Sequence, residues 1–213
     1  MLKAAIFDLD GTITDTLPVS AAAFIKTLHQ HTGREYTPSE IFAMFGPPEE
    51  IIFEHLKPSQ GQLLMSDYLA NYRQVHPQYA SIYPQVTEAL TWLKEQGIPC
   101  SIVTGKGRDA ARITLELMGL EEIFPLVVTG SCVDCPKPEP EGILAVLRTL
   151  GVPAQKAFYL GDSPGDIQAA RGARVLSLGA LWGSRHPEAL LKAQPDLAFA
   201  TPGQFLAWLK GEY

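Results

Sequence analysis

The sequence predicts an α/β protein with a Rossmann-like parallel sheet covered by helices on both faces, plus a small all-helical second domain. Two observations lead to this fold class. Short apolar runs of strand length alternate with stretches of helical spacing, which is the pattern of parallel strands joined by crossover helices. One long segment, residues 16–81, breaks that alternation because it has helical spacing and no convincing strand.

The apolar runs of strand length end at residues that favour a turn or that could do chemistry. The first covers residues 4–7 and leads directly into Asp8. Further strands are predicted at 99–103, 126–128, 157–160 and 174–178. Because the ligand crevice of an open α/β sheet lies at the carboxyl ends of its strands, we expect the residues that follow these runs to converge.

Helical spacing fills the segments between the predicted strands. In the core, helices are predicted at 86–96, 107–118, 140–150 and 164–172, with a last amphipathic helix at 202–209. The long segment has further helical patterns at 21–31, 39–45, 48–56 and 60–75. We therefore predict an α/β core made of residues 1–15 and 82–213 and a helical cap domain made of residues 16–81.

Composition narrows the class of function. A chain of 213 residues with 46% hydrophobic content can bury a core without disulfides, and three cysteines do not suggest a disulfide framework. The net charge of -6, without a run of Lys or Arg, argues against binding to nucleic acid or to an anionic membrane surface. No signal peptide and no membrane-spanning run is recognisable, so we expect a cytoplasmic protein. The sequence leaves the oligomeric state open between monomer and homodimer.

Cys132 and Cys135 have the spacing of half a zinc site. No second pair of ligands with suitable spacing accompanies them. We interpret them as two thiols in a turn before Pro136 and assign them no role.

Two carboxylates follow the first predicted strand, in Asp8-Leu9-Asp10-Gly11-Thr12. A carboxylate can attack phosphorus to give an aspartyl-phosphate, and a second carboxylic acid can protonate the leaving oxygen. Gly11 suits a turn with demanding dihedral angles. Taken alone, the motif is more often a simple turn, because Asp and Gly are common turn formers.

A metal ligand is predicted after the strand at 157–160. Asp162 follows that strand, and Asp166 lies about one helical turn further on. Mg²⁺ prefers one or two carboxylates together with water and substrate phosphate, which suits Asp162. Asp166 could orient a metal-bound water or pair with a lysine, although the same segment could simply cap a helix.

Phosphate-binding groups are predicted in two further segments. Thr104 and Gly105 stand between a strand and a helix, where a hydroxyl and backbone N–H groups can bind phosphate oxygens. Lys106 could contact the same group or point to solvent. Lys137 has a proline on either side, which holds it in an extended segment where its charge could balance the nucleophile and the phosphate.

Together and in this order, the motifs resemble those of the haloacid dehalogenase-like hydrolase superfamily. The likeness rests on residues 8–12, 104–106, 137–140 and 161–166. The helical segment, with Phe45-Gly46-Pro47-Pro48, is similar to the cap of the phosphoglycolate phosphatase-like branch, and Trp182-Gly183 in the core is similar to that branch as well.

The resemblance implies a Mg²⁺-dependent phosphatase that hydrolyses a small phosphate monoester, phosphoglycolate or a similar metabolite, through an aspartyl-phosphate. It implies that Asp8 is the nucleophile and a metal ligand. It also implies that Asp10 is the general acid and base, with its backbone carbonyl on the metal. The remaining implied roles are phosphate binding by Thr104 and Gly105, charge neutralisation by Lys137, metal ligation by Asp162 and support of the metal site by Asp166.

Two positions depart from the family pattern. Gln85 stands where a glycine is usual, and Gly172-Ala173-Arg174 replaces a small-residue pair that ends in glycine. Neither position belongs to the predicted catalytic set. The departures therefore bear on the subfamily more than on the reaction.

Alternatives remain open at this point. A β-phosphoglucomutase-like phosphosugar mutase would use the same aspartyl-phosphate, and the cap would separate it from a phosphatase. Haloacid dehalogenation does not need the acid at Asp10, and a non-catalytic protein would not need the complete set of acidic residues. Phosphoglycolate, a sugar phosphate, a nucleotide and pyrophosphate are all possible substrates, with Phe45, Pro47 and Glu49 as the predicted cap residues of the pocket.

Overall fold

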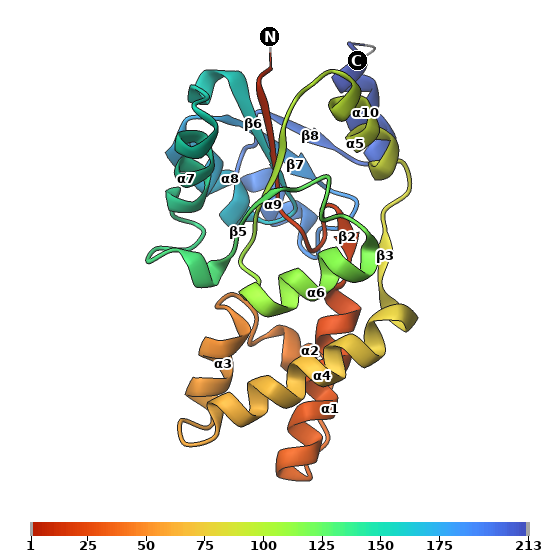
Figure 1. The fold of residues 1–213 in the computed structure, drawn as a ribbon, viewed down its shortest axis with the longest axis vertical. Coiled ribbons are helices and arrows are strands. Elements are labelled where there is room, and N and C mark those ends of the chain that lie inside the picture. Colours follow the sequence, from red (N-terminus) through yellow and green to blue (C-terminus); the bar gives the residue numbers. More distant parts are fainter. Residues whose placement is uncertain (1, 212–213) are drawn as a thin grey trace.

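A computed structural model describes residues 2–211 (Figure 1). Its centre is a six-stranded sheet with the order β5-β4-β1-β6-β7-β8, in which all neighbouring strands run parallel. The strands are β1 (Ala4–Phe7), β4 (Cys100–Val103), β5 (Leu126–Val128), β6 (Ala157–Gly161), β7 (Leu176–Ala180) and β8 (Leu197–Phe199). The predicted α/β, Rossmann-like fold class is confirmed.

Strand β1 shows why these apolar runs become strands. Its residues alternate between two buried clusters: Ala5 and Phe7 belong to one, Ala4 and Ile6 to the other. Side chains of a strand point to opposite faces in turn, so a strand covered on both faces must be apolar throughout. This burial explains a continuous apolar run in place of an alternating one.

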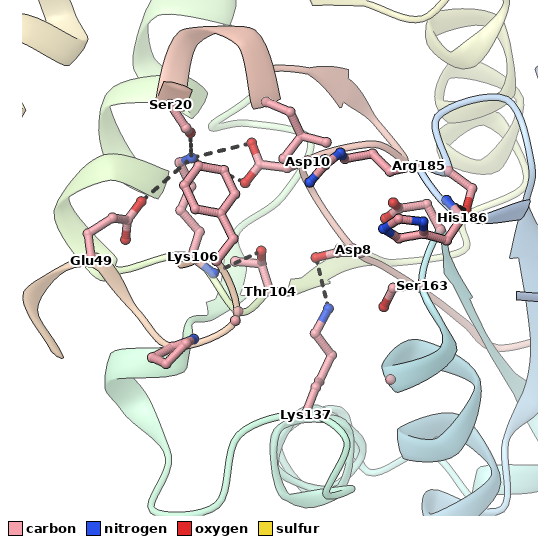
Figure 2. Close-up of a pocket in the computed structure, with 18 of the residues that line it drawn as sticks. Asp8, Asp10, Ser20, Glu49, Thr104, Lys106, Lys137, Ser163, Arg185 and His186 are labelled. Carbon is pink, nitrogen blue, oxygen red and sulfur yellow. Dashed lines mark hydrogen bonds and ion pairs between the residues drawn. The ribbon is translucent and has the colours of Figure 1, made fainter. Parts of the chain in front are cut away.

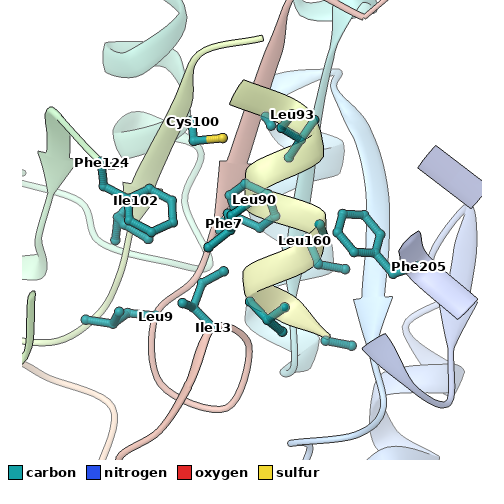
Figure 3. Close-up of a cluster of buried hydrophobic side chains, with 14 of the residues drawn as sticks. Phe7, Leu9, Ile13, Leu90, Leu93, Cys100, Ile102, Phe124, Leu160 and Phe205 are labelled. Carbon is teal, nitrogen blue, oxygen red and sulfur yellow. The ribbon is translucent and has the colours of Figure 1, made fainter. Parts of the chain in front are cut away.

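Helices cover both faces of the sheet, with α7 and α8 on one side and α5 and α10 on the other (Figure 1). The core helices are α5 (Val86–Glu95), α6 (Arg108–Met118), α7 (Glu141–Leu150), α8 (Pro164–Ala173), α9 (Pro187–Lys192) and α10 (Pro202–Lys210). Figure 3 shows the cluster under α5, in which Phe7 of β1 packs with Leu90 and Phe205. No helix within residues 2–211 is both long enough and apolar enough to cross a bilayer.

Four helices form a separate layer below the sheet (Figure 1). They are α1 (Leu17–Thr32), α2 (Pro38–Phe42), α3 (Glu49–Leu56) and α4 (Gly61–Tyr79). Their apolar faces enclose stacked aromatic rings, with the Phe24 and Phe53 centroids 4.7 Å apart. The same cluster includes Ala110 and Ile113 of α6, so this helical layer packs on the core through α6.

The chain enters and leaves the helical layer through two short strands. β2 (Thr14–Asp15) pairs antiparallel with β3 (Ser81–Ile82). These strands lie where the joints of the cap were expected. The division into an α/β core and a cap at 16–81 stays a prediction.

Several short elements were not predicted from the sequence, namely β2, β3, β8 and α9. β7 was predicted two residues too early, at 174–178 instead of Leu176–Ala180. The shift of β7 has a local cause. Arg174 ends α8 in the left-handed conformation, with φ of 60°, so the strand begins only after the turn.

The two departures from the family's glycine pattern both occupy left-handed backbone. Gln85 has φ of 65° and Arg174 has φ of 60°. For residues with a Cβ atom this conformation costs roughly 1–2 kcal/mol. The usual glycine at these positions therefore reflects a backbone requirement, which this chain meets with strained residues.

We expect Arg174→Gly to stabilise the protein. Glycine removes the left-handed strain, which stabilises the folded state. It also raises the entropy of the unfolded chain, which costs about 0.5–1 kcal/mol, so the free energy of unfolding should rise by about 0.5–1 kcal/mol. Urea unfolding measures this free energy. Arg174→Ala keeps the Cβ atom and serves as the control; equal stability of the two variants would contradict the strain argument.

Candidate active site

Residues from five strand ends line one cavity of about 330 Å³. Asp8 follows β1, Thr104 follows β4, and Asp162 follows β6, while Lys137 and Arg185 come from the loops after β5 and β7. The chain runs outward from β1 to β4 and β5 and then returns to β6 on the other side of β1. The cavity therefore lies at the point where the strand order reverses, which is where α/β sheets bind ligands.

Most of the predicted site residues meet in this cavity. Its lining includes Asp8, Asp10, Thr104, Gly105, Lys137 and Asp162. The helical layer contributes Phe45, Pro47 and Glu49, the three residues expected from that part of the chain. Asp166 is completely buried behind the lining.

Three carboxylates form an acidic cluster. Asp8, Asp162 and Asp166 each offer an oxygen, and these oxygens lie within 4.8 Å of one another. Burial raises the pKa of Asp8 to about 6, against the lowering effect of Lys137. Burial, followed by repulsion from Asp166 and Asp8, also raises the pKa of Asp162. Buried negative charge in excess of its cations favours the binding of a metal ion.

The acidic cluster fits Mg²⁺ in its chemistry. All the candidate ligands are carboxylate oxygens, the type that Mg²⁺ prefers. Asp8 Oδ1 accepts no hydrogen bond from any described residue, although Lys137 Nζ lies 3.0 Å away, so a lone pair remains available. The side chain of Asp10 is outside this cluster. A metal role for Asp10 would therefore fall to its backbone carbonyl, as the resemblance implies.

Gly11 brings the first loop against the acidic cluster. Its φ of 79° lies in the left-handed region, and a Cβ atom here would be 2.6 Å from Asp162 Oδ2. Only glycine therefore permits both the turn and the close approach to the end of β6. The demanding dihedral angles expected at Gly11 are present.

Lys137 is fixed by buried partners. Its ammonium lies 2.5 Å from Asp166 and 3.0 Å from Asp8, and it donates a hydrogen bond of 3.0 Å to the Tyr159 hydroxyl. Burial alone would lower the pKa of Lys137, but Asp166 and Asp8 raise it above its ordinary value. Burial would likewise raise the pKa of Asp166, but Lys137 and hydrogen bonds from Ser163 lower it. Lys137 is thus a permanent cation beside Asp8.

A second buried lysine, Lys106, holds Asp10 near residues of the helical layer (Figure 2). Lys106 is only 7% exposed, so it does not point to solvent. Its ammonium lies 3.2 Å from Asp10 Oδ2, 3.1 Å from the Ser20 hydroxyl and 3.7 Å from Glu49. Burial would lower the pKa of Lys106, but Asp10 and its other neighbours raise it well above the ordinary value.

Glu49 ties this network to the helical layer. It begins α3, and its carboxylate accepts a 2.5 Å hydrogen bond from the backbone N–H of Gly107, next to Lys106. The Tyr68 hydroxyl donates a further hydrogen bond of 3.3 Å to Glu49. Core and helical layer are therefore joined at the cavity by a buried ion pair and not only by apolar packing.

The sequence analysis missed Ser20, Arg185 and His186 as lining residues. Asp162 directly follows β6, but Arg185 and His186 come five and six residues after the end of β7, so their distance from that strand hides them from a strand-end argument. Ser20 lies within α1, and nothing in the local sequence distinguishes it. Cys132 and Cys135 are free and exposed, and neither belongs to a group of potential metal ligands within residues 2–211.

Lys106→Met should destabilise the protein by about 3–5 kcal/mol, because it leaves two largely buried carboxylates without their cation. The measurement is the free energy of unfolding in urea. Arg73→Met is the matched control, since Arg73 pairs with Glu116 at the surface and its loss should cost below about 1 kcal/mol. Similar costs for both variants would contradict a strong buried pair. Glu49→Gln added to Lys106→Met should recover part of the loss.

Several known proteins are similar to this chain over nearly its whole length. The chain is 33% identical over 210 residues to "Putative pyrophosphatase PpaX" of Caldanaerobacter subterraneus, covering 99% of this chain and 96% of that protein. It is 31% identical over 195 residues to pyrophosphatase PpaX of Bacillus velezensis, covering 92% and 90% of the two chains. A solved "putative beta-phosphoglucomutase" of Thermotoga maritima is 27% identical, with a TM-score of 0.80 and full coverage of both chains.

A family model describes most of the same chain. The model of haloacid dehalogenase-like hydrolases matches residues 5–180, which include both carboxylates of the first loop and the loop after β6. The match and the curated relatives extend over well more than half of the sequence. This protein belongs to the haloacid dehalogenase-like hydrolase family.

Proposed function

We propose that this protein is a Mg²⁺-dependent phosphatase of the phosphoglycolate phosphatase-like branch, acting on a small phosphorylated metabolite. The observation that carries the proposal is the placement of Asp8. It stands at the carboxyl end of β1, among buried acids and 3.0 Å from the Lys137 ammonium, in a cavity lined by both the core and the helical layer (Figure 2). The proposed nucleophile, Asp8, thus lies next to a cation that can balance the charge of a phosphate.

In the first step, a carboxylate oxygen of Asp8 attacks phosphorus and forms an aspartyl-phosphate. The bond from phosphorus to the leaving oxygen breaks, and protonated Asp10 gives its proton to that oxygen. Thr104 and the backbone of Gly105 bind the phosphoryl oxygens, and Lys137 balances their charge. Bound Mg²⁺, held by Asp8, Asp162 and the backbone of Asp10, would neutralise and orient the phosphoryl group.

In the second step, water attacks the phosphorus of the aspartyl-phosphate. Asp10, now a carboxylate, takes the proton of the water, and the bond between phosphorus and Asp8 breaks. Inorganic phosphate leaves, and both aspartates return to their starting protonation states. The Lys106 ammonium, 3.2 Å from Asp10, fixes the position of this acid and base through the cycle.

The substrate is proposed to be phosphoglycolate or pyrophosphate. Pyrophosphate is favoured by the curated relatives named pyrophosphatase, and phosphoglycolate by the likeness of the motifs to that branch. Both are small enough for a cavity of about 330 Å³.

A phosphosugar mutase is the second candidate, because the Thermotoga maritima structure carries that name. It would form the same aspartyl-phosphate but return the phosphate to a sugar. Conversion of a hexose phosphate into its isomer without net release of phosphate would favour the mutase. Release of phosphate from the small metabolites would favour the phosphatase.

Asp8→Asn should abolish phosphate release, because the amide cannot form the aspartyl-phosphate. Asp10→Asn should lower kcat by about 10²–10⁴-fold, the usual contribution of a general acid and base. Phosphate release from a panel of metabolites in Mg²⁺ measures both. Borohydride reduces an aspartyl-phosphate to homoserine, so peptide mass spectrometry should find homoserine at position 8 in the wild type and not in Asp8→Asn.

The Asp8→Asn variant also allows a check on folding. Removing a buried carboxyl with a raised pKa should not lower the melting temperature, so loss of activity with an intact thermal transition identifies a chemical role. Turnover at the wild-type rate in Asp8→Asn would contradict the proposal.

Mg²⁺ should raise the melting temperature by several degrees, because it binds the folded acidic cluster. At about 100 times its Kd, a ligand adds about 2.7 kcal/mol of stability. Asp162→Asn should remove most of this shift, and chelation by EDTA should stop phosphate release. Asp196→Asn is the control, since Asp196 bonds Ser177 outside the cavity and should keep the full shift. An unchanged shift in Asp162→Asn would count against the metal site.

A further inference from the structure

We propose that Arg185 binds a second anionic group of the substrate, a phosphate or a carboxylate, so that the enzyme prefers substrates with two anions. The inference rests on the proposed phosphatase activity and deepens it by giving a substrate class. Arg185 would then be a specificity-determining residue rather than part of the phosphoryl-transfer machinery.

Charge pairing in the cavity singles out Arg185. Lys106 is paired with Asp10 and Glu49, and Lys137 with Asp8 and Asp166. Arg185 lines the same cavity, yet no carboxylate of the described chain lies within ion-pair distance of it. An arginine that faces a binding cavity without an acidic partner is suited to bind an anionic ligand.

The backbone that carries Arg185 is fixed against the first loop. The Trp182 indole N–H donates a 3.1 Å hydrogen bond to the carbonyl of Thr12. A Cβ atom on Gly183 would lie 1.9 Å from the carbonyl oxygen of Gly11, so the two loops are in direct contact. The position of Arg185 relative to Asp8 is therefore set by the same packing that shapes the catalytic loop.

The guanidinium of Arg185 is oriented by the helical layer. Its central carbon lies 3.8 Å from the centre of the Phe42 ring, at the end of α2. Stacking uses the face of the guanidinium and leaves its N–H edge available for a two-point contact with a carboxylate or phosphate. Figure 2 shows Arg185 and His186 reaching from the loop toward the side of the cavity that holds Asp8 and Asp10.

These contacts place two anion sites in one small cavity. The transferred phosphoryl group binds among Asp8, Thr104 and Lys137, which all line the cavity. The second anion binds at Arg185, which lines the same cavity and stacks on Phe42 of the helical layer. A short substrate such as pyrophosphate or phosphoglycolate carries its two charged groups close together and can reach both sites.

The test uses two matched pairs of substrates with wild type, Arg185→Met and Arg185→Lys in Mg²⁺. Phosphoglycolate is compared with 2-hydroxyethyl phosphate, and pyrophosphate with methyl phosphate, so that each pair differs in the second anion. For each pair, the measured quantity is kcat/KM of the substrate with two anions divided by kcat/KM of its partner with one. In at least one pair, this ratio should fall about 10–100-fold in Arg185→Met, with an intermediate fall in Arg185→Lys. The pair that responds identifies carboxylate or phosphate as the second anion. Equal losses for both members of each pair would overturn the proposal.

Arg34→Met provides a matched control. Arg34 is also an exposed arginine stacked on an aromatic ring, 4.5 Å from the centre of Tyr36, but it lies outside the cavity. Its replacement should leave every ratio unchanged. A change in the ratios equal to that of Arg185→Met would show a general effect of surface charge and would also overturn the proposal.

A binding measurement separates failure of this inference from failure of the proposed function. Calorimetry in Mg²⁺ compares methylenediphosphonate, which has two anions and resists hydrolysis, with methylphosphonate. Arg185→Met should weaken the binding of methylenediphosphonate about 10–100-fold more than the binding of methylphosphonate. If no substrate is hydrolysed but this difference appears, only the proposed reaction is wrong. If substrates are hydrolysed without the difference, only the role of Arg185 is wrong.

Discussion

The structure depends on one electrostatic constraint. The buried carboxylates around the cavity have to be balanced by positive charges held in fixed positions. Asp8 and Asp166 share one lysine, Lys137, and Asp162 lies close to both acids. Burial raises the pKa of Asp8 in spite of that ammonium. Folding therefore leaves a site with an unmet demand for cations. The proposed divalent ion and phosphorylated substrate would meet this demand, and their binding would then stabilise the fold.

The two lysines of the cavity pair with different acids. Lys137 pairs with Asp8 and Asp166, whereas Lys106 pairs with Asp10 and with Glu49 of the helical layer. Because Glu49 comes from α3, the environment of Asp10 includes a residue of the helical layer. The group proposed to move protons thus has a neighbour, Lys106, that contacts both the core and the helical layer.

Elements and site residues could be predicted from the sequence where they depend on residues close by in the chain, such as a buried strand or the turn that follows it. The strands at 4–7 and 126–128 were predicted because both faces of the sheet require apolar side chains, and Asp8, Thr104 and Asp162 followed from strand ends. What could not be predicted depends on partners distant in the chain. The burial of Lys106 results from Ser20 and Glu49, and no pattern around residue 106 reveals them. The short strand β8 likewise exists only because β7 offers a free edge.

Because β2 pairs with β3, the chain leaves the core and returns to it at adjacent points. A segment whose two ends meet can be exchanged or resized without altering the order of the sheet, so the residues that the helical layer contributes to the cavity can change while those at the strand ends stay the same. The ion pair to Lys106 limits that freedom: any replacement segment has to present an acid where Glu49 now stands, or leave a buried ammonium with one partner fewer.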